Sequence, residues 1–320
     1  MKLRKLYEAA VKVGIDYDPR GKAAVRAELR RVKKTYDGLK GNDKKVFDTE
    51  RLTNPYSDSR ILHGKDGAEI KSVIMGIDME IGEVLLTDRL REKGTKIDLI
   101  WAHHPEGGAQ ANLSGVMAMQ ADILHAHGVP INVAEGIMGP RIKQVQRGVM
   151  PINHMRAVDA ARILDIPMIC THTPADNCVA TYLQKLFDTK KPETVGDVLG
   201  VLRDIPEYAE AEKLGAGLRV FTGSEERRTG KVLVDMTGGT GGSHKAFEKL
   251  ANTSDIGTIV GMHISEKNRE QAEKNHINVV IAGHIASDTL GMNLLLDGVE
   301  KAAKRKFDLI ECSGFRRYRH

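Results

Sequence analysis

Short runs of Val, Ile and Leu alternate with segments of helical spacing over most of this chain, from Ser72 onward. Such runs are typical of buried strands, and strands that alternate with helices predict an α/β fold. Polar side chains that follow these strands are of special interest, because ligands of open α/β sheets bind outside the carboxyl ends of the strands. The pattern therefore predicts a fold class and also the edge at which a site would lie.

The predicted elements fall into two similar halves. Strands are expected at residues 73–78, 97–102, 130–134, 166–170, 231–235, 258–262, 278–282 and 308–311. Helices are expected at residues 82–93, 114–127, 141–149 or 155–164, 177–186, 244–251, 266–274 and 289–304. In both halves strand, turn, helix and strand lead to a histidine, so that Asp78 matches Asp235 and His103 matches His263. We therefore expect two similar α/β lobes with mixed sheets that face a central metal cleft.

The chain is expected to divide into three parts. Residues 1–71 form an N-terminal helical extension with a connecting segment, and residues 72–190 form the first lobe. Residues 191–320 form the second lobe, which the strand at 308–311 completes. The extension is highly charged, so we expect it to be peripheral and to serve in docking or oligomer contacts.

Composition narrows the class of protein. Hydrophobic residues make up 41% of the chain and charged residues 28%, and no stretch approaches the roughly 18 apolar residues of a membrane helix. The three cysteines form no CxxC pair, and the first residues lack the apolar region of a signal peptide, so we expect a cytoplasmic protein without membrane partners. The net charge of +5 is modest and aromatic residues make up only 4%, which argues against nucleic-acid binding.

Three short clusters of metal-ligating residues dominate the chemistry of the sequence. They are His103-His104-Pro105-Glu106, the segment from His172 to Asp176, and the segment from His284 to Asp288. Each follows a predicted strand. Imidazole nitrogen and carboxylate oxygen are ligands of zinc, manganese, iron and nickel alike, so the clusters predict a metal site but do not select the metal.

The spacing within the clusters predicts two ions rather than one. Past the end of a strand, adjacent histidines can both face one cavity, and a pair so close suits two neighbouring ions. His284 and Asp288 lie four residues apart and share one face of a helical turn. Asp176 would supply a carboxylate between the ions, unless it only caps a helix N-terminus, where negative charge is favoured. The predicted metal ligands are His103, His104, Asp176, His284 and Asp288, with open positions left for water.

Other features allow two interpretations. The turn at residues 237–243 could bind phosphate through the backbone amides of Gly238, Gly239, Gly241 and Gly242, or could only connect a strand tightly to a helix. His263 stands at a strand end and would face the same cleft. Asp58 and Arg60 in the connecting segment either face a site or pair with each other at the surface.

These motifs together resemble the Nif-three-like family of dinuclear metal proteins, often described as GTP cyclohydrolase I type 2 homologues. The resemblance covers Ser72 to the C-terminus and rests on four motifs: His103-His104-Pro105, His172-Thr-x-x-Asp176, the turn beginning at Gly238, and Gly283-His284-x-x-x-Asp288. It implies two α/β lobes, ring-like homo-oligomers, typically hexamers, and metal ligands at the five positions given above. It also implies that His172 lies beside the metals as a supporting or acid–base group.

The chain departs from the family pattern in two places. The family usually has Glu where this chain has Asp288, whose shorter side chain could change how the carboxylate binds or leave a water in its place. The segment between His104 and His172 is also longer than in compact relatives. We therefore expect an inserted element between Gly107 and Pro151.

A site of two divalent ions with open positions predicts a metal-dependent hydrolase. The expected substrate is a phosphorylated or purine-like small molecule, with His172 or Glu106 transferring protons. GTP ring opening is implied by the resemblance alone. The alternative is a non-catalytic protein that binds metal for regulation or metal handling.

Overall fold

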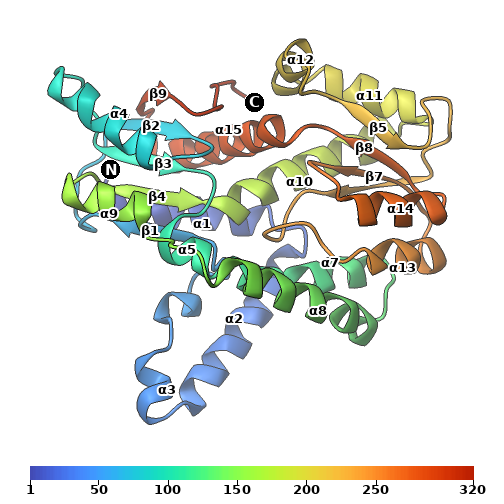
Figure 1. Ribbon diagram of the computed structural model, residues 1–320, viewed down its shortest axis with the longest axis horizontal. Coiled ribbons are helices and arrows are strands. Elements are labelled where there is room, and N and C mark those ends of the chain that lie inside the picture. The colour runs from blue at the N-terminus through green and yellow to red at the C-terminus, as the bar shows by residue number, and fades with distance from the viewer.

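The computed structural model describes residues 1–320 and contains two mixed sheets joined by long helices (Figure 1). The first sheet has the order β1-β4-β3-β2-β9 and consists of β1 (Ser59–His63), β2 (Ser72–Gly76), β3 (Leu99–Ala102), β4 (Met168–Thr171) and β9 (Asp308–Glu311). The second has the order β5-β8-β7-β6 and consists of β5 (Arg219–Thr222), β6 (Lys231–Asp235), β7 (Ile256–Gly261) and β8 (Asn278–Ile281). The predicted α/β class with two mixed sheets is confirmed.

The two sheets repeat one connectivity. Three parallel strands (β2, β3 and β4 in the first sheet, β6, β7 and β8 in the second) are flanked by one antiparallel edge strand, β1 or β5. Ala102 and Gly261 occupy equivalent places, each opposite the last residue of the neighbouring strand. His263 therefore lies where the first half has His104, and the predicted match with His103 is off by one residue.

The first sheet contains two strands that were not assigned to it from the sequence. The connecting segment contributes β1, which pairs with β4 as an edge strand. Strand β9 was expected to complete the second lobe, but it lies parallel to β2 in the first sheet. The helix before β9 carries the chain back across the molecule, so β9 meets the first sheet rather than the second.

Two long helices cross between the sheets. Helix α10 (His172–Lys190) follows β4 of the first sheet and packs against β6 of the second, whereas α15 (His284–Ala303) follows β8 of the second sheet and leads to β9 of the first. The helices approach closely at Gly291, where an added Cβ would lie 2.6 Å from the carbonyl oxygen of Ala175. The two helices are thereby held in one arrangement near their N-terminal ends.

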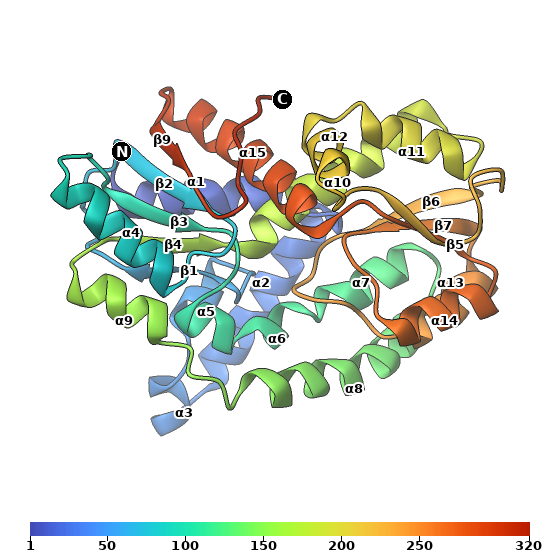
Figure 2. The same ribbon diagram turned by 45° about the horizontal axis from the view of Figure 1, so that its top comes forward.

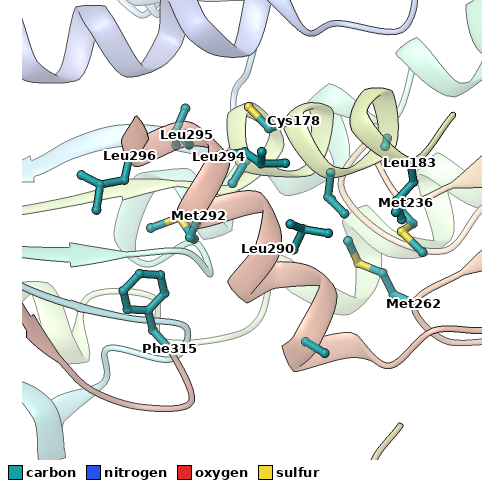
Figure 3. Packing of buried hydrophobic residues seen from close by; sticks show 14 of the residues in the cluster. Cys178, Leu183, Met236, Met262, Leu290, Met292, Leu294, Leu295, Leu296 and Phe315 are labelled. Carbon is teal, nitrogen blue, oxygen red and sulfur yellow. The ribbon is translucent and has the colours of Figure 1, made fainter. Parts of the chain in front are cut away.

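The largest hydrophobic core surrounds α10 and α15 (Figure 3). Leu183 of α10 and Leu290 of α15 lie in one cluster of 39 buried residues. Val73 from the first sheet and Val232 from the second belong to the same cluster, so a single core connects the two halves. Burial of this many apolar side chains is the main source of stability in such a fold.

Helix α1 (Leu3–Asp16) belongs to the core and is not peripheral as expected. Leu3, Leu6 and Ala10 are fully buried against α10 and α15. Only α2 (Gly21–Gly38) and α3 (Gly41–Lys45) project away as an arm (Figure 1). The N-terminal extension was correctly predicted to be helical, but the sequence could not show which surface its apolar residues would cover.

The remaining helices lie over the faces and edges of the two sheets. They are α4 (Ile81–Glu92), α5 (Gly107–Ala111), α6 (Leu113–Val116), α7 (Met119–Ala126), α8 (Ile131–Val149), α9 (Arg156–Ile163), α11 (Val195–Arg203), α12 (Pro206–Lys213), α13 (Lys245–Thr253), α14 (Glu266–Lys274) and the short 3-10 helix η1 (Thr49–Leu52). None of them combines the length and apolar character that a membrane crossing needs.

The segment between Gly107 and Pro151, where an insertion was expected, folds as helices α5 to α8. These helices run along the lower edge of the molecule from the first sheet to the second (Figure 2). The strand predicted at residues 130–134 is wrong, because these residues begin α8. Ala134 and Met138, one turn apart, are its buried residues, and a short apolar run does not by itself distinguish a strand from a buried helical turn.

Candidate metal centre

Side chains from both halves of the chain meet where β3, β4 and β8 end. Two adjacent histidines follow β3, and both α10 and α15 begin with a histidine and carry an aspartate one turn later. The structure brings together His103, His104, His172, Asp176, His284 and Asp288. The His-x-x-x-Asp motif thus occurs twice, at the start of equivalent helices, and the crossing of α10 and α15 makes the two copies converge.

The carboxylate of Asp288 lies at the centre of this group. Its Oδ1 is 3.4 Å from Nε2 of His103, and its Oδ2 is 3.4 Å from Nε2 of His104 and 3.5 Å from Nε2 of His284. The donor atoms form three sets, within each of which all atoms lie within 4.8 Å of one another, and two of these sets contain Asp288: His103, Asp176 and Asp288, and His104, His284 and Asp288. Asp288, rather than Asp176 as expected, is the carboxylate that the two sets share, and its shorter side chain reaches both.

The geometry of the donor atoms fits bound cations. A charge-assisted N–H···O hydrogen bond is about 2.7–2.9 Å long, and the contacts above are longer. Two ligands on one tetrahedral ion with bonds of about 2.1 Å are about 3.4 Å apart. Nε2 of His103 and both carboxylate oxygens of Asp288 are buried and have no hydrogen-bond partner. Because unpaired buried polar atoms are costly, a divalent ion would satisfy atoms that the protein alone leaves unsatisfied.

Two carboxylates outside the donor sets hold histidine rings in place. Asp78, just past β2, contacts Nδ1 of His104 at 2.6 Å, and Asp58, just before β1, contacts Nδ1 of His172 at 2.8 Å. A carboxylate on Nδ1 orients the ring and makes its Nε2 a better ligand. Of the two interpretations of Asp58, the structure supports the one in which it faces the site. Asp78 was not among the predicted site residues, although its place as the last residue of a predicted strand was a usable clue.

Arg60 does not pair with Asp58. Its guanidinium forms an ion pair of 2.6 Å with Asp48 and lies 3.8 Å from Glu50. Asp58 lies just before β1 and Arg60 is its second residue, and the two side chains have different partners.

Burial and neighbouring charges set the protonation states in the absence of metal. Burial lowers the pKa of His103 to about 4 and raises that of Asp176 to about 8. Burial also disfavours the charged form of His104, but the carboxylates of Asp288 and Asp78 outweigh it and raise the pKa to about 10. Burial acts to raise the pKa of Asp288, yet the surrounding histidines hold it far below its usual range. A neutral His103 and an ionised Asp288 are the forms that bind a cation.

The raised pKa of Asp176 predicts a pH-dependent stability of the metal-free protein. The folded state favours the protonated carboxyl of Asp176. This preference stabilises the fold fully below pH 3.8, and the stabilisation is lost as the pH rises through about 8. Over this range we expect the melting temperature of chelator-treated wild type to fall by roughly several degrees relative to that of Asp176→Asn. Thermal denaturation at a series of pH values measures this. A constant difference between the two proteins would contradict the prediction.

A cavity of about 510 Å³ opens beside the metal centre and extends along the second sheet. His172, Asp176 and His284 line one end, and the first residues of α14 line another part. The volume is within the range of small-molecule sites. The predicted substrate-binding residues Gly239, Gly241, Gly242 and His263 line this cavity, whereas Gly238 does not and instead packs against Gln120.

The two predicted acid–base residues lie in different surroundings. The ring of His172 is centred 5.0 Å from that of His103, and its Nε2 is 3.8 Å from Oδ2 of Asp176. With His103 and His104 it forms a third group that could hold an ion. Glu106 directly precedes α5 and is not among the residues that line the cavity, and burial raises its pKa to about 7. Its catalytic role stays a prediction.

Comparison with known proteins places the fold. No protein-family model matches the chain, and no curated protein matches its sequence. A solved NIF3 superfamily protein from Sphaerobacter thermophilus is similar over 81% of this chain and 91% of its own, with 25% identity and a TM-score of 0.68.

Two further solved structures show more distant likeness. Reduced HcgD from Methanocaldococcus jannaschii shares 14% identity over 79% of this chain and 87% of its own, with a TM-score of 0.49. The Staphylococcus aureus hypothetical protein SA1388 shares 15% identity over 80% and 89%, with a TM-score of 0.42. The assignment rests on the Sphaerobacter protein. Its similarity, together with the repeated sheets and the strand-end motifs, identifies this chain as a NIF3-like protein, as the motifs predicted.

Proposed function

We propose that this chain binds two divalent ions and acts as a metal-dependent hydrolase on a nucleotide or another phosphorylated small molecule. GTP cyclohydrolase I type 2 activity is the specific form that the family resemblance suggests. The observation that carries the proposal is the position of Asp288, whose two oxygens face separate histidines beside a cavity of about 510 Å³ that His172, Asp176 and His284 line.

Divalent ions in such a centre supply Lewis-acid polarisation of the substrate and lower the pKa of water. The chain's own residues supply orientation and proton transfer. Asp58 occupies Nδ1 of His172, which leaves Nε2 on the side of Asp176 free to take or give a proton. Phe247 and Ile259 line the cavity and exclude water from part of its wall.

The proposal includes a cytoplasmic location and assembly into a homohexamer. Free thiols at Cys170, Cys178 and Cys312 support a reducing compartment. The hexamer is supported by the family resemblance. Light scattering coupled to size-exclusion chromatography tests it.

Loss of His104 tests the enzymatic proposal. We expect His104→Ala to lower kcat/KM by more than about 100-fold, because supporting residues of metal sites alone are worth roughly 10- to 100-fold. Turnover is measured with metal-loaded protein against a panel of nucleotides and phosphoesters, and metal content by elemental analysis. The matched control is His125→Ala, an exposed histidine of α7.

The same assay separates the hydrolase from the alternative. Wild-type protein that binds metal but turns over no member of the panel would favour a regulatory or metal-handling role. Equal turnover in His104→Ala and wild type would contradict a catalytic role of the centre.

A further inference from the structure

Two basic side chains line the cavity without an acidic partner. Arg141 comes from α8, and Lys267 comes from the first turn of α14. Nε of Arg141 donates to the carbonyl oxygen of Gly241 at 2.9 Å and Nη1 to the side chain of Gln144 at 2.9 Å, which leaves Nη2 free. Lys267 forms neither a hydrogen bond nor an ion pair through its ammonium group. Both cations are available to a ligand.

The order of contacts along the cavity places Arg141 away from the metal centre. The ring of His284 is 5.2 Å from the ring of His263. Gly241 lies next to His263, because a Cβ added at Gly241 would be 3.5 Å from Cε1 of His263. Arg141 in turn donates to the carbonyl oxygen of Gly241. A ligand that reaches from His284 to Arg141 therefore spans the part of the wall formed by His263 and Gly241.

The turn between β6 and α13 presents backbone amides to the same cavity. Nε2 of Gln120 donates to the carbonyl oxygens of Gly238 and Thr240, both at 2.7 Å. In a trans peptide the N–H points opposite to the carbonyl, so the N–H groups of Gly239 and Gly241 point away from Gln120. Gln120 does not line the cavity, whereas Gly239 and Gly241 do. Neither of these amides donates to a protein acceptor.

Nearby carboxylates do not neutralise the two cations. Glu266 lines the cavity, but both of its oxygens accept from Nε of Arg269 on its own helix, at 3.0 and 3.1 Å. Burial raises the pKa of Asp235 at the end of β6, which favours its uncharged form. The cavity wall therefore carries two cations, one on α8 and one on α14, that no carboxylate neutralises.

We infer that this part of the cavity is a phosphate subsite, formed by Arg141 and Lys267 with the amides of Gly239 and Gly241. A guanidinium and an ammonium group both suit phosphate. Together these groups offer more N–H donors than the two oxygens of a carboxylate accept, whereas a phosphate monoester presents three terminal oxygens. The inference rests on the proposed function and narrows it: the substrate is held by its phosphate away from the metal centre, and a different bond lies at the metals.

Binding of inorganic pyrophosphate to metal-free protein tests the subsite, because without metal ions the anion can bind only to the chain. Isothermal titration calorimetry is expected to show roughly 10- to 100-fold weaker binding for Arg141→Gln and for Lys267→Gln, the loss expected for one charge-assisted contact. Arg141→Lys is expected to recover part of the affinity. The controls are Arg147→Gln on α8 and Lys274→Gln on α14, which are exposed and outside the cavity and are expected to bind as wild type does.

The outcomes separate the subsite from the hydrolase. No binding to wild type, or equal binding to wild type, Arg141→Gln and Lys267→Gln, overturns the subsite even if metal-loaded protein is active. Malonate that binds as tightly as pyrophosphate and depends equally on Arg141 overturns the choice of phosphate over carboxylate. Pyrophosphate binding that depends on both cations supports the subsite even if no hydrolysis is found.

Discussion

Asp288→Asn is expected to abolish binding of the two metal ions proposed for the centre while the fold persists. Asp288 is the carboxylate common to two donor sets, and its side chain is fully buried. Asn keeps the shape but removes the negative charge that a divalent ion requires. Since supporting residues of metal sites are worth roughly 10- to 100-fold in affinity, loss of the shared ligand should exceed about 100-fold.

Elemental analysis and thermal denaturation with added metal measure this effect. A ligand that binds only the folded state raises the melting temperature, so zinc or manganese should stabilise the wild type and leave Asp288→Asn unchanged. Asp308→Asn, the same chemical change at an exposed position of β9, should respond to metal as the wild type does. Undiminished metal content in Asp288→Asn would rule out Asp288 as the shared ligand.

Gly291→Ala is expected to destabilise the protein, because it acts where α10 and α15 cross. The added Cβ would meet the carbonyl oxygen of Ala175 at 2.6 Å, which forces the two helices apart. Overpacking of this kind costs about 1–3 kcal/mol. Asp176 and Asp288 lie on the same two helices close to the contact, so metal affinity should fall together with stability.

Denaturant unfolding of the metal-free protein isolates the packing effect from metal binding. The matched control is Gly200→Ala in α11, where an added Cβ meets no atom within 4 Å. That change should be neutral or stabilising by up to about 1 kcal/mol, because Ala is the better helix former. Equal free energies of unfolding for the two variants would show that the helix crossing tolerates separation.

Local sequence was sufficient for most elements and for the types of residue at the site. The apolar runs that became β2, β3, β6, β7 and β8 are short and bounded by polar residues, and this pattern depends only on neighbours along the chain. The same reasoning placed His103, His104 and His284 past the ends of strands. It failed at residues 130–134, where an apolar run fits a strand and a helical turn equally well.

Tertiary structure decided which of these residues act together. Asp58 contacts His172 across 114 residues of sequence, and Asp288 takes the shared position because α10 and α15 cross at Gly291. The burial of α1 and the entry of β9 into the first sheet likewise depend on which apolar surfaces meet. Periodicity along the chain determines that a side chain faces inward or follows a strand. Only packing between distant segments determines which residues that side chain contacts, because the packing that forms is the one that buries the most apolar area over the whole molecule.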